Sequence, residues 1–167
     1  SSWTIAGLGG SIATGTTAPD GTTGAATVTA TTNTITTTFY SQSLSLAVGQ
    51  YFIAGLYQRF NTPDDYYDFS GAGTYGLQIN IGGSGNTATC SPLWTPGIAT
   101  DEWVWVWTLC KVTAAPTTPA TVTLTSAAPA VGSHASVLDF YAPMLLNIPA
   151  STISNDEVYE LANNLVP

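Results

Sequence analysis

Hydrophobic and polar residues alternate with a period of two along most of the chain, as they do in β-strands that bury one face. Turn signals such as Pro19-Asp20-Gly21 and Val48-Gly49-Gln50 interrupt this alternation. The pattern predicts eight or nine strands, at residues 3–6, 26–30, 34–46, 51–60, 75–81, 88–94, 102–113, 121–125 and 136–145. Short strands separated by Gly, Pro and Asn turns favour an all-β fold, an antiparallel two-sheet β-sandwich.

Helical periodicity is found at the C-terminal end. Ser154 is followed three residues later by Glu157, which is the pattern of a capping box. Apolar residues then recur at helical spacing, at Val158, Leu161, Ala162 and Leu165. We predict a short α-helix over residues 154–165 that docks by this stripe. Together with the strands of residues 1–145 it forms one domain over residues 1–167.

Charge is scarce and strongly unbalanced. Only 7% of the 167 residues are charged, and two cations, Arg59 and Lys111, face ten acidic residues, which gives a net charge of −8. Nucleic-acid binding needs clustered Lys and Arg, and anionic membrane surfaces attract the same residues. This composition argues against both partners and favours an extracellular or virion-surface location. We also expect no membrane insertion, because no apolar run reaches the ~20 residues of a membrane span.

The two cysteines, Cys90 and Cys110, allow two interpretations. Both can be buried thiols, which are common in protein cores. Alternatively, they form a disulfide that closes a loop of about twenty residues and stabilises the fold by about 3 kcal/mol. The even number of cysteines and the extracellular composition favour the disulfide.

Several segments together resemble the carbohydrate-binding-module-like jelly rolls of phage tail and virion-associated proteins. These segments are Trp3, Ala18-Pro19-Asp20-Gly21-Thr22, Tyr40-Ser41-Gln42-Ser43, Ala47-Val48-Gly49, the strand from Tyr51 to Arg59, Glu102-Trp103-Val104 and Phe140-Tyr141-Ala142-Pro143. The resemblance covers roughly residues 1–145. The segment from Ile153 to Leu165 is similar instead to the helix that closes laminin-G-like sandwiches.

This resemblance implies a jelly-roll topology, a non-catalytic contact with glycans or a receptor, and a place in a larger assembly. It also implies a structural calcium ion near the N-terminal loop, where Asp20 is the matching acid. The alternative for Asp20 is a turn residue whose side chain hydrogen-bonds its own backbone.

Trp103, Trp105, Trp107 and Leu109 occupy alternate positions of one predicted strand and therefore share one face. The C-terminal helix or a loop can cover this face, a neighbouring copy of the chain can bury it, or it can form a platform on which sugar rings stack. The segment from Tyr51 to Tyr57 is apolar on both faces, which indicates a strand covered on both sides. This second strand favours the interface between copies over the sugar platform.

The segment 64–68 mixes acids with aromatic residues, and two interpretations stay open for it. Tyr66 and Tyr67 would stack on a sugar while Asp65 and Asp68 accept its hydroxyl groups, or the loop is simply solvated. We expect no enzyme, because His134 is the only histidine and no nucleophile motif or phosphate-binding loop accompanies it.

These observations lead to one expectation about function. The chain is a non-enzymatic structural or adhesion domain of an extracellular or phage virion protein. It builds an assembly with copies of itself or neighbouring surface proteins and contacts glycans. The alternative is a carbohydrate-binding module appended to a secreted enzyme.

Overall fold

The computed structural model describes residues 4–6, 10–31, 35–61, 76–82, 87–90, 101–114, 120–128, 136–150 and 153–165. These residues form ten strands and one helix. The elements are β1 (Thr4–Ala6), β2 (Gly10–Thr16), β3 (Ala25–Ala30), β4 (Ile35–Leu44), β5 (Tyr51–Phe60), β6 (Gly76–Gly82), β7 (Thr87–Cys90), β8 (Val104–Ala114), β9 (Ala120–Ala128), β10 (Ser136–Ile148) and α1 (Asn155–Asn164).

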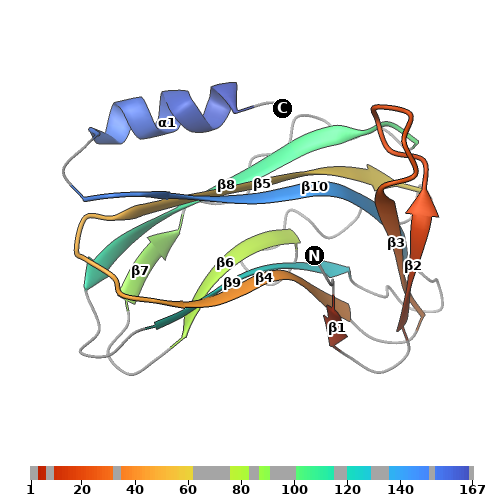
Figure 1. The fold of residues 1–167 in the computed structure, drawn as a ribbon, viewed down its shortest axis with the longest axis horizontal. Helices are drawn as coiled ribbons and strands as arrows, with labels where there is room; N and C mark the ends of the chain where they lie inside the picture. Colours follow the sequence, from red (N-terminus) through yellow and green to blue (C-terminus); the bar gives the residue numbers. More distant parts are fainter. Residues whose placement is uncertain are drawn as a thin grey trace.

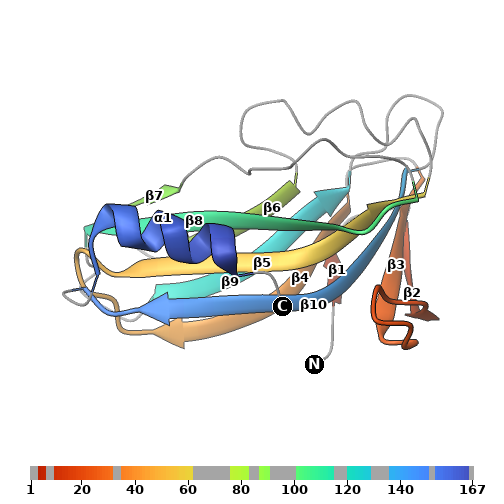
Figure 2. The ribbon, with the colours of Figure 1, turned by 90° about the horizontal axis from the view of Figure 1, so that it is seen from above.

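The strands form two antiparallel sheets that lie face to face (Figure 1). One sheet has six strands in the order β2-β3-β10-β5-β8-β7, and the other has four in the order β1-β4-β9-β6. The helix α1 lies on the outer face of the six-stranded sheet, which is the face turned away from the four-stranded sheet. Seen from above, α1 runs over β8 and β5 (Figure 2). The prediction of a mainly antiparallel β fold with a C-terminal helix is confirmed.

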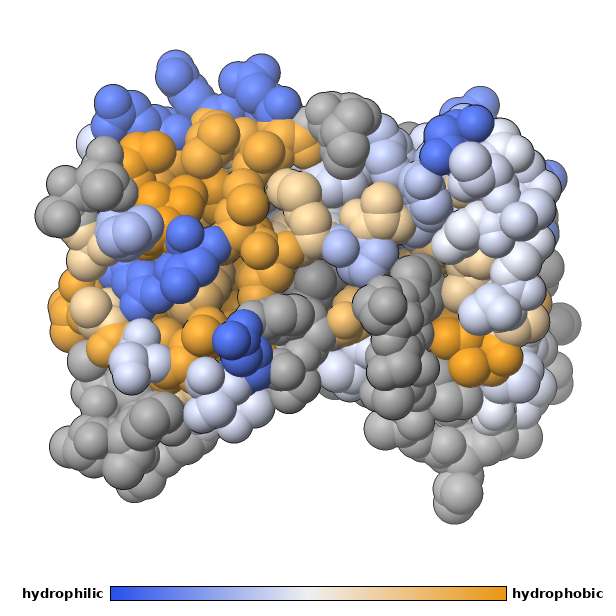
Figure 3. Space-filling model, in the orientation of Figure 1, coloured by the Kyte–Doolittle hydropathy of each residue, from blue (hydrophilic) through white to orange (hydrophobic). Residues whose placement is uncertain are grey.

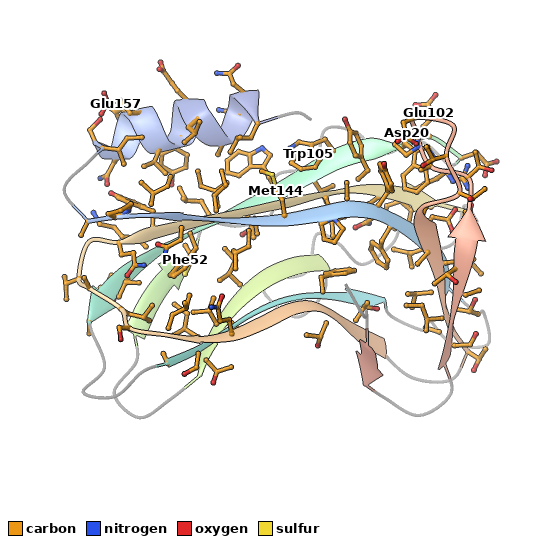
Figure 4. All side chains as sticks on the ribbon, viewed as in Figure 1. Asp20, Phe52, Glu102, Trp105, Met144 and Glu157 are labelled. Atoms are coloured by element: carbon orange, nitrogen blue, oxygen red, sulfur yellow. The ribbon has the colours of Figure 1, made fainter. Side chains whose placement is uncertain are left out.

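The main core fills the space between the sheets. Alternate residues of β5, among them Phe52 and Leu56, point toward the four-stranded sheet and are fully buried. Figure 4 shows Phe52 in this space. The opposite sheet contributes Phe39 from β4 and Val122 from β9, and the Phe39 ring meets Phe140 of β10 edge-on at 5.3 Å between ring centroids. The period-two pattern of the sequence therefore does encode the buried face.

The strand β5 is also covered on its other face. Tyr51 and Ile53 point outward and belong to a second buried cluster, which includes Val158 and Ala162 of α1. The prediction that this strand is covered on both sides is confirmed, and within the chain the helix provides the second cover.

The helix begins as the sequence predicts. Ser154 is its N-cap, and its hydroxyl oxygen accepts from the backbone N–H of Glu157 while the Glu157 carboxylate accepts from the backbone N–H of Ser154. These two reciprocal bonds satisfy two backbone donors at the helix start. Val158 and Ala162 are buried against the sheet, and Leu161 and Leu165 pack beside them. The predicted docking stripe is confirmed.

Several strands differ from the prediction: β4 ends at Leu44, two residues before its predicted end, β9 runs on to Ala128, three residues past its predicted end, and β2 and β10 differ as follows. The strand β2 was not predicted, because its sequence Gly-Ser-Ile-Ala-Thr-Gly-Thr is rich in Gly and has only one large apolar residue, Ile12. It forms because β3 offers an edge to which its backbone can bond. The strand β10 continues to Ile148, three residues past the predicted end at Leu145, because β5 continues beside it.

Candidate binding face of the six-stranded sheet

A β-bulge divides the outer face of the six-stranded sheet into two regions. The register between β10 and β5 shifts between Tyr141 and Met144, so Ala142 and Pro143 together oppose one residue of β5. Ala142 has φ +48°, which is uncommon for a residue with a side chain. On one side of the bulge, Met144 packs under α1, and on the other side Tyr141 faces the same direction beyond the helix.

The helix covers the region that holds Trp107. This indole is 6% exposed and Trp105 is 8% exposed, and both belong to the cluster with Val158 and Ala162. Figure 4 shows Met144 and Trp105 on the outer face of the six-stranded sheet, near the C-terminal end of α1. The sequence left three possibilities for this face of β8: cover by the C-terminal helix or a loop, burial against a second copy, or an open sugar platform. In the structure, the C-terminal helix covers it. Neither indole forms an open platform here, because α1 supplies the apolar surface that the pattern requires.

Polar contacts fix the start of α1 on the sheet. Lys111 Nζ of β8 lies 5.1 Å from the ring centroid of Tyr51 and donates a hydrogen bond of 3.1 Å to Asn155 Oδ1. The Tyr51 hydroxyl donates to the same oxygen. Near this point Glu157 has a pKa below its ordinary range, because the backbone N–H and the hydroxyl of Ser154 both donate to its carboxylate. These contacts hold the helix over the buried indoles.

Beyond the helix, three aromatic side chains from three neighbouring strands form a continuous group. Tyr57 of β5 stacks on Tyr141 of β10, with ring centroids 6.4 Å apart and an interplanar angle of 30°. Tyr57 also meets Trp105 of β8 edge-on at 5.2 Å. The Trp105 ring lies across Gly55, where a Cβ atom would overlap the indole. Both tyrosines are partly exposed.

An ion pair lies beside these rings. Arg59 donates to Asp139 Oδ2 through Nε at 2.9 Å and through an Nη atom at 2.6 Å. Asp139 is 1% exposed, and its other carboxylate oxygen accepts from the Thr27 hydroxyl. The guanidinium lies over the Trp103 ring at 4.9 Å from the centroid. We call Tyr57, Tyr141, Trp103, Trp105 and this ion pair the aromatic patch.

Asp20 closes the patch at the end away from α1, as Figure 4 shows. It lies in the loop between β2 and β3, and Tyr141 donates to its Oδ2 at 2.6 Å. Its Oδ1 accepts from the backbone N–H and the hydroxyl of Thr22. The bond from Tyr141, followed by those from Thr22, lowers the pKa of Asp20. The same bond to Asp20 raises the pKa of Tyr141, because the carboxylate stabilises the protonated phenol.

The surroundings of Asp20 bear on the expected calcium ion. Both of its oxygens accept protein hydrogen bonds, as in a side chain that closes a turn. No cluster of three or more His, Cys, Asp or Glu residues suited to a metal occurs in the part of the chain that the structure describes. The turn interpretation of Asp20 thus has geometric support, whereas calcium at this position stays a prediction.

The predicted disulfide does not appear in the structure. Cys90 and Cys110 are Cα partners in the β7–β8 register, but no disulfide is present among the side chains that the structure describes. Cys110 is fully buried in the core between the sheets, where a thiol packs as a small apolar group. The side chain of Cys90 lies outside the described residues.

The other predicted contact loop also lies outside the described residues. It contains Asp65, Tyr66, Tyr67 and Asp68. Its role in glycan or interface contact therefore stays a prediction.

Only part of the patch was predicted from the sequence. The alternation within residues 102–113 predicted a shared face for Trp103 and Trp105 but gave no sign of Tyr57, Tyr141 or Asp139. Tyr141 and Asp139 join Tyr57 and Arg59 only through the pairing of β10 with β5, strands about eighty residues apart in sequence. The odd positions of the segment from Tyr51 to Arg59 would have indicated Tyr57, but no local pattern identifies its partner Tyr141.

Comparison of the chain with known protein families, with curated proteins and with solved structures found no match. Among the described residues, no helix is both long and apolar enough to span a bilayer. The chemistry of the patch must therefore be judged from its own residues. Flat, partly exposed rings beside hydrogen-bonding charged groups suit reversible binding of a ligand that has an apolar face and hydroxyl groups.

Proposed function

We propose that the chain is a non-enzymatic structural and adhesion domain of an extracellular or virion-surface protein, with the aromatic patch as its glycan contact. We further propose that its two sheets form a β-sandwich of jelly-roll type. Its other partners would be copies of itself or neighbouring surface proteins. The resemblance of residues 1–145 to carbohydrate-binding-module-like jelly rolls supports this proposal, as does the low charge of the chain.

One observation carries the glycan contact. Tyr57 and Tyr141 stack at an interplanar angle of 30° and stay partly exposed, next to the Arg59–Asp139 ion pair. Sugar rings have apolar C–H faces that pack on aromatic rings, and hydroxyl groups that need donors and acceptors at the ring edge. The patch offers both, and most of its groups are already fixed by contacts within the protein. Fixed groups lose little conformational entropy on binding.

Charge indicates which glycans fit. The guanidinium of Arg59 is neutralised by Asp139 at 2.6 Å, and Asp20 adds a further negative charge at the end of the patch. The chain as a whole carries −8. Sulfated or uronic-acid polymers would be repelled over the Debye length of about 8 Å at physiological salt. Neutral oligosaccharides therefore match the patch best.

The alternative, a carbohydrate-binding module appended to a secreted enzyme, would use the same patch. It gains support from the cover that α1 places on Trp107, because this cover removes the apolar strand face as an interface between copies. The two functions differ in whether the isolated domain associates with itself, which the next subsection addresses.

Binding of neutral oligosaccharides tests the proposal. We expect at least one neutral oligosaccharide from a panel of glucans, mannans and xylans to bind the protein. Binding should give a saturable titration in calorimetry and shift the tryptophan fluorescence. Replacing Tyr57→Ala should abolish this binding. Tyr159→Ala, an exposed helix position, is the matched control.

Circular dichroism and a thermal scan should first show that Tyr57→Ala is folded. If this variant is unfolded, Tyr141→Phe provides a second test, because it keeps the ring and removes only the hydroxyl. Absence of binding by the wild type to every neutral oligosaccharide at millimolar concentration would overturn the glycan contact. Equal binding by the wild type and folded Tyr57→Ala would also place the contact elsewhere.

A further inference from the structure

In each sheet, one inner strand extends past its short neighbour, so that part of it has a described strand partner on one side only. In the six-stranded sheet, β3 pairs with β10 only at residues 136–140, so residues 142–148 have a described strand partner only in β5. In the four-stranded sheet, β1 pairs with β4 only at residues 36–38, and residues 40–44 have a described strand partner only in β9. Figures 1 and 2 show these parts of β10 and β4 running alongside each other.

The described side chains along these two edges include incompletely buried apolar ones, which alternate with exposed polar ones such as Gln42, Ser43 and Asn147. Leu145 of β10 and Leu44 and Leu46 from β4 and its following turn pack against the inter-sheet core but stay partly exposed. Val48, in the next turn, is 58% exposed. Figure 3 shows hydrophobic surface on this side of the molecule, below the polar surface of α1 and interrupted by strongly hydrophilic residues. We call residues 40–48 and 142–148 the edge surface.

The edge surface lacks the charged side chains that usually keep strand edges apart. Neither residues 40–48 nor residues 142–148 include Asp, Glu, Lys or Arg, although the chain carries −8 elsewhere. Natural edge strands are commonly protected by charged side chains, and a long apolar edge without them invites strand pairing. Pro143 lacks a backbone donor, but it lies within the bulge, and residues 144–148 continue as regular strand.

We infer that the edge surface is an interface between two copies of this chain, in which β10 pairs antiparallel with β10 of the second copy. A two-fold axis perpendicular to the sheets relates the two copies in this pairing. The same rotation places β4 beside β4 of the second copy. Both sheets then continue across the interface, and the apolar side chains of both edges are covered together. Such an isologous contact closes as a dimer.

Because the edge surface contains a strand from each of the two sheets, it suits a second copy of the chain better than another partner. A single extended peptide from another protein satisfies one strand edge only and leaves the other sheet open. A charged partner finds no opposite charge on the edge surface. Two copies of an uncharged surface meet without placing carboxylates against each other, while the negative charge of the chain remains in solvent.

This inference deepens the assembly part of the proposed function, and its test is independent of glycan binding. Sedimentation velocity of the full chain should give about twice the monomer mass of 17.3 kDa at micromolar concentration, with dissociation on dilution. Asn147, exposed near the middle of the unpaired part of β10, is the position to change. In an antiparallel pair centred on Leu146, the two copies of residue 147 lie about 8 Å apart.

Two variants of opposite charge make the test specific. Asn147→Lys and Asn147→Asp should each weaken association about tenfold or more, because like charges meet across the axis. An equimolar mixture of the two should restore the dimer, since opposite charges then meet. Tyr159→Lys, on the exposed side of α1, should associate as the wild type does. Restoration in the mixture cannot result from general destabilisation.

Folding of the variants is checked by circular dichroism, because Gln50 donates a hydrogen bond to Asn147 Oδ1. If Asn147→Lys unfolds, Ser43→Lys on the exposed part of β4 replaces it and should likewise weaken association. A monomeric wild type at 100 μM or more would overturn the inference, whatever the glycan result. A dimer unaffected by folded variants at both Asn147 and Ser43 would overturn it as well, and would indicate another interface or a strand from elsewhere.

Discussion

The Tyr141 hydroxyl donates a hydrogen bond of 2.6 Å to Asp20 Oδ2 and thereby joins β10 to the loop between β2 and β3. The two residues are 121 positions apart in the sequence. The bond requires an ionised carboxylate and a protonated phenol, so its contribution to stability depends on pH at both ends of the scale.

The pH dependence follows from the two pKa shifts. Folding lowers the pKa of Asp20, so its contribution is complete above the ordinary value of 3.8 and is lost as the pH falls through the lower folded-state value. Folding raises the pKa of Tyr141, so its contribution is complete below 10.0 and is lost as the pH rises through the higher folded-state value. We expect the wild type to have a higher melting temperature than Tyr141→Phe between about pH 5 and pH 9. The difference between the two melting temperatures should shrink outside that window. A difference in melting temperature that is constant from pH 2 to pH 11 would contradict this.

Docking of α1 should depend on Val158. This side chain is fully buried against the outer face, and a helix of ten residues is marginal in water without packing. We expect Val158→Ala to lower the free energy of unfolding by about 2 kcal/mol, measured by urea denaturation. Glu160→Ala, an exposed helix position, serves as the control and should change it by less than about 0.5 kcal/mol. Equal effects of the two variants would mean that the helix is not held by this face.

Gly55 should tolerate no side chain. A Cβ atom there would overlap the Trp105 ring, which is itself confined by Tyr57 and the helix cluster. We expect Gly55→Ala to destabilise the fold by about 1–3 kcal/mol and to change the near-ultraviolet circular dichroism of the indoles. Gly82→Ala is the matched control, because the nearest atom to an added Cβ there lies 3.7 Å away. A Gly55→Ala variant with wild-type stability and spectrum would show that the indole does not lie on Gly55.

Trp105 itself should tolerate loss of its indole nitrogen. Its Nε1 is buried and has no hydrogen-bond acceptor, one of four such side-chain atoms among the described residues. Removing an unpaired buried donor relieves a desolvation cost and offsets part of the lost ring contact. We expect Trp105→Phe to cost clearly less than the roughly 3–5 kcal/mol typical of replacing a buried Trp by Ala. Parallel melts of Trp105→Phe and Trp105→Ala measure the difference, and equal losses would contradict the prediction.

The Arg59–Asp139 pair should show strong coupling. Asp139 is 1% exposed, so removing its cation leaves a buried carboxylate whose remaining partner among the described side chains is the Thr27 hydroxyl. We expect Arg59→Met to cost about 3 kcal/mol, whereas Arg59→Met combined with Asp139→Leu should recover much of that loss. Urea denaturation of the two single variants and the double variant gives the coupling energy. Additive losses would mean that the two charges act independently.

Some of this architecture is encoded locally. Period-two alternation indicated β5 with its observed bounds, and the capping box and apolar stripe indicated α1, because both patterns arise from the geometry of a single element. The alternation also placed Trp105, Trp107 and Leu109 on one face, which the structure confirms. β2 was missed because its pairing with β3, rather than its own side chains, makes it a strand.

The sequence by itself determined the β class, the C-terminal helix and the shared face of the indoles. Only the tertiary structure decided what covers that face, because the choice between a helix, a second copy and a sugar depends on where α1 docks. It also decided that Tyr57, Tyr141, Arg59 and Asp139 form one group. Their contacts arise from pairing between strands distant in sequence, and local periodicity carries no information about which strands become neighbours. For the same reason, the parts of β4 and β10 that have a described strand partner on one side only can be identified only once the strand order is known.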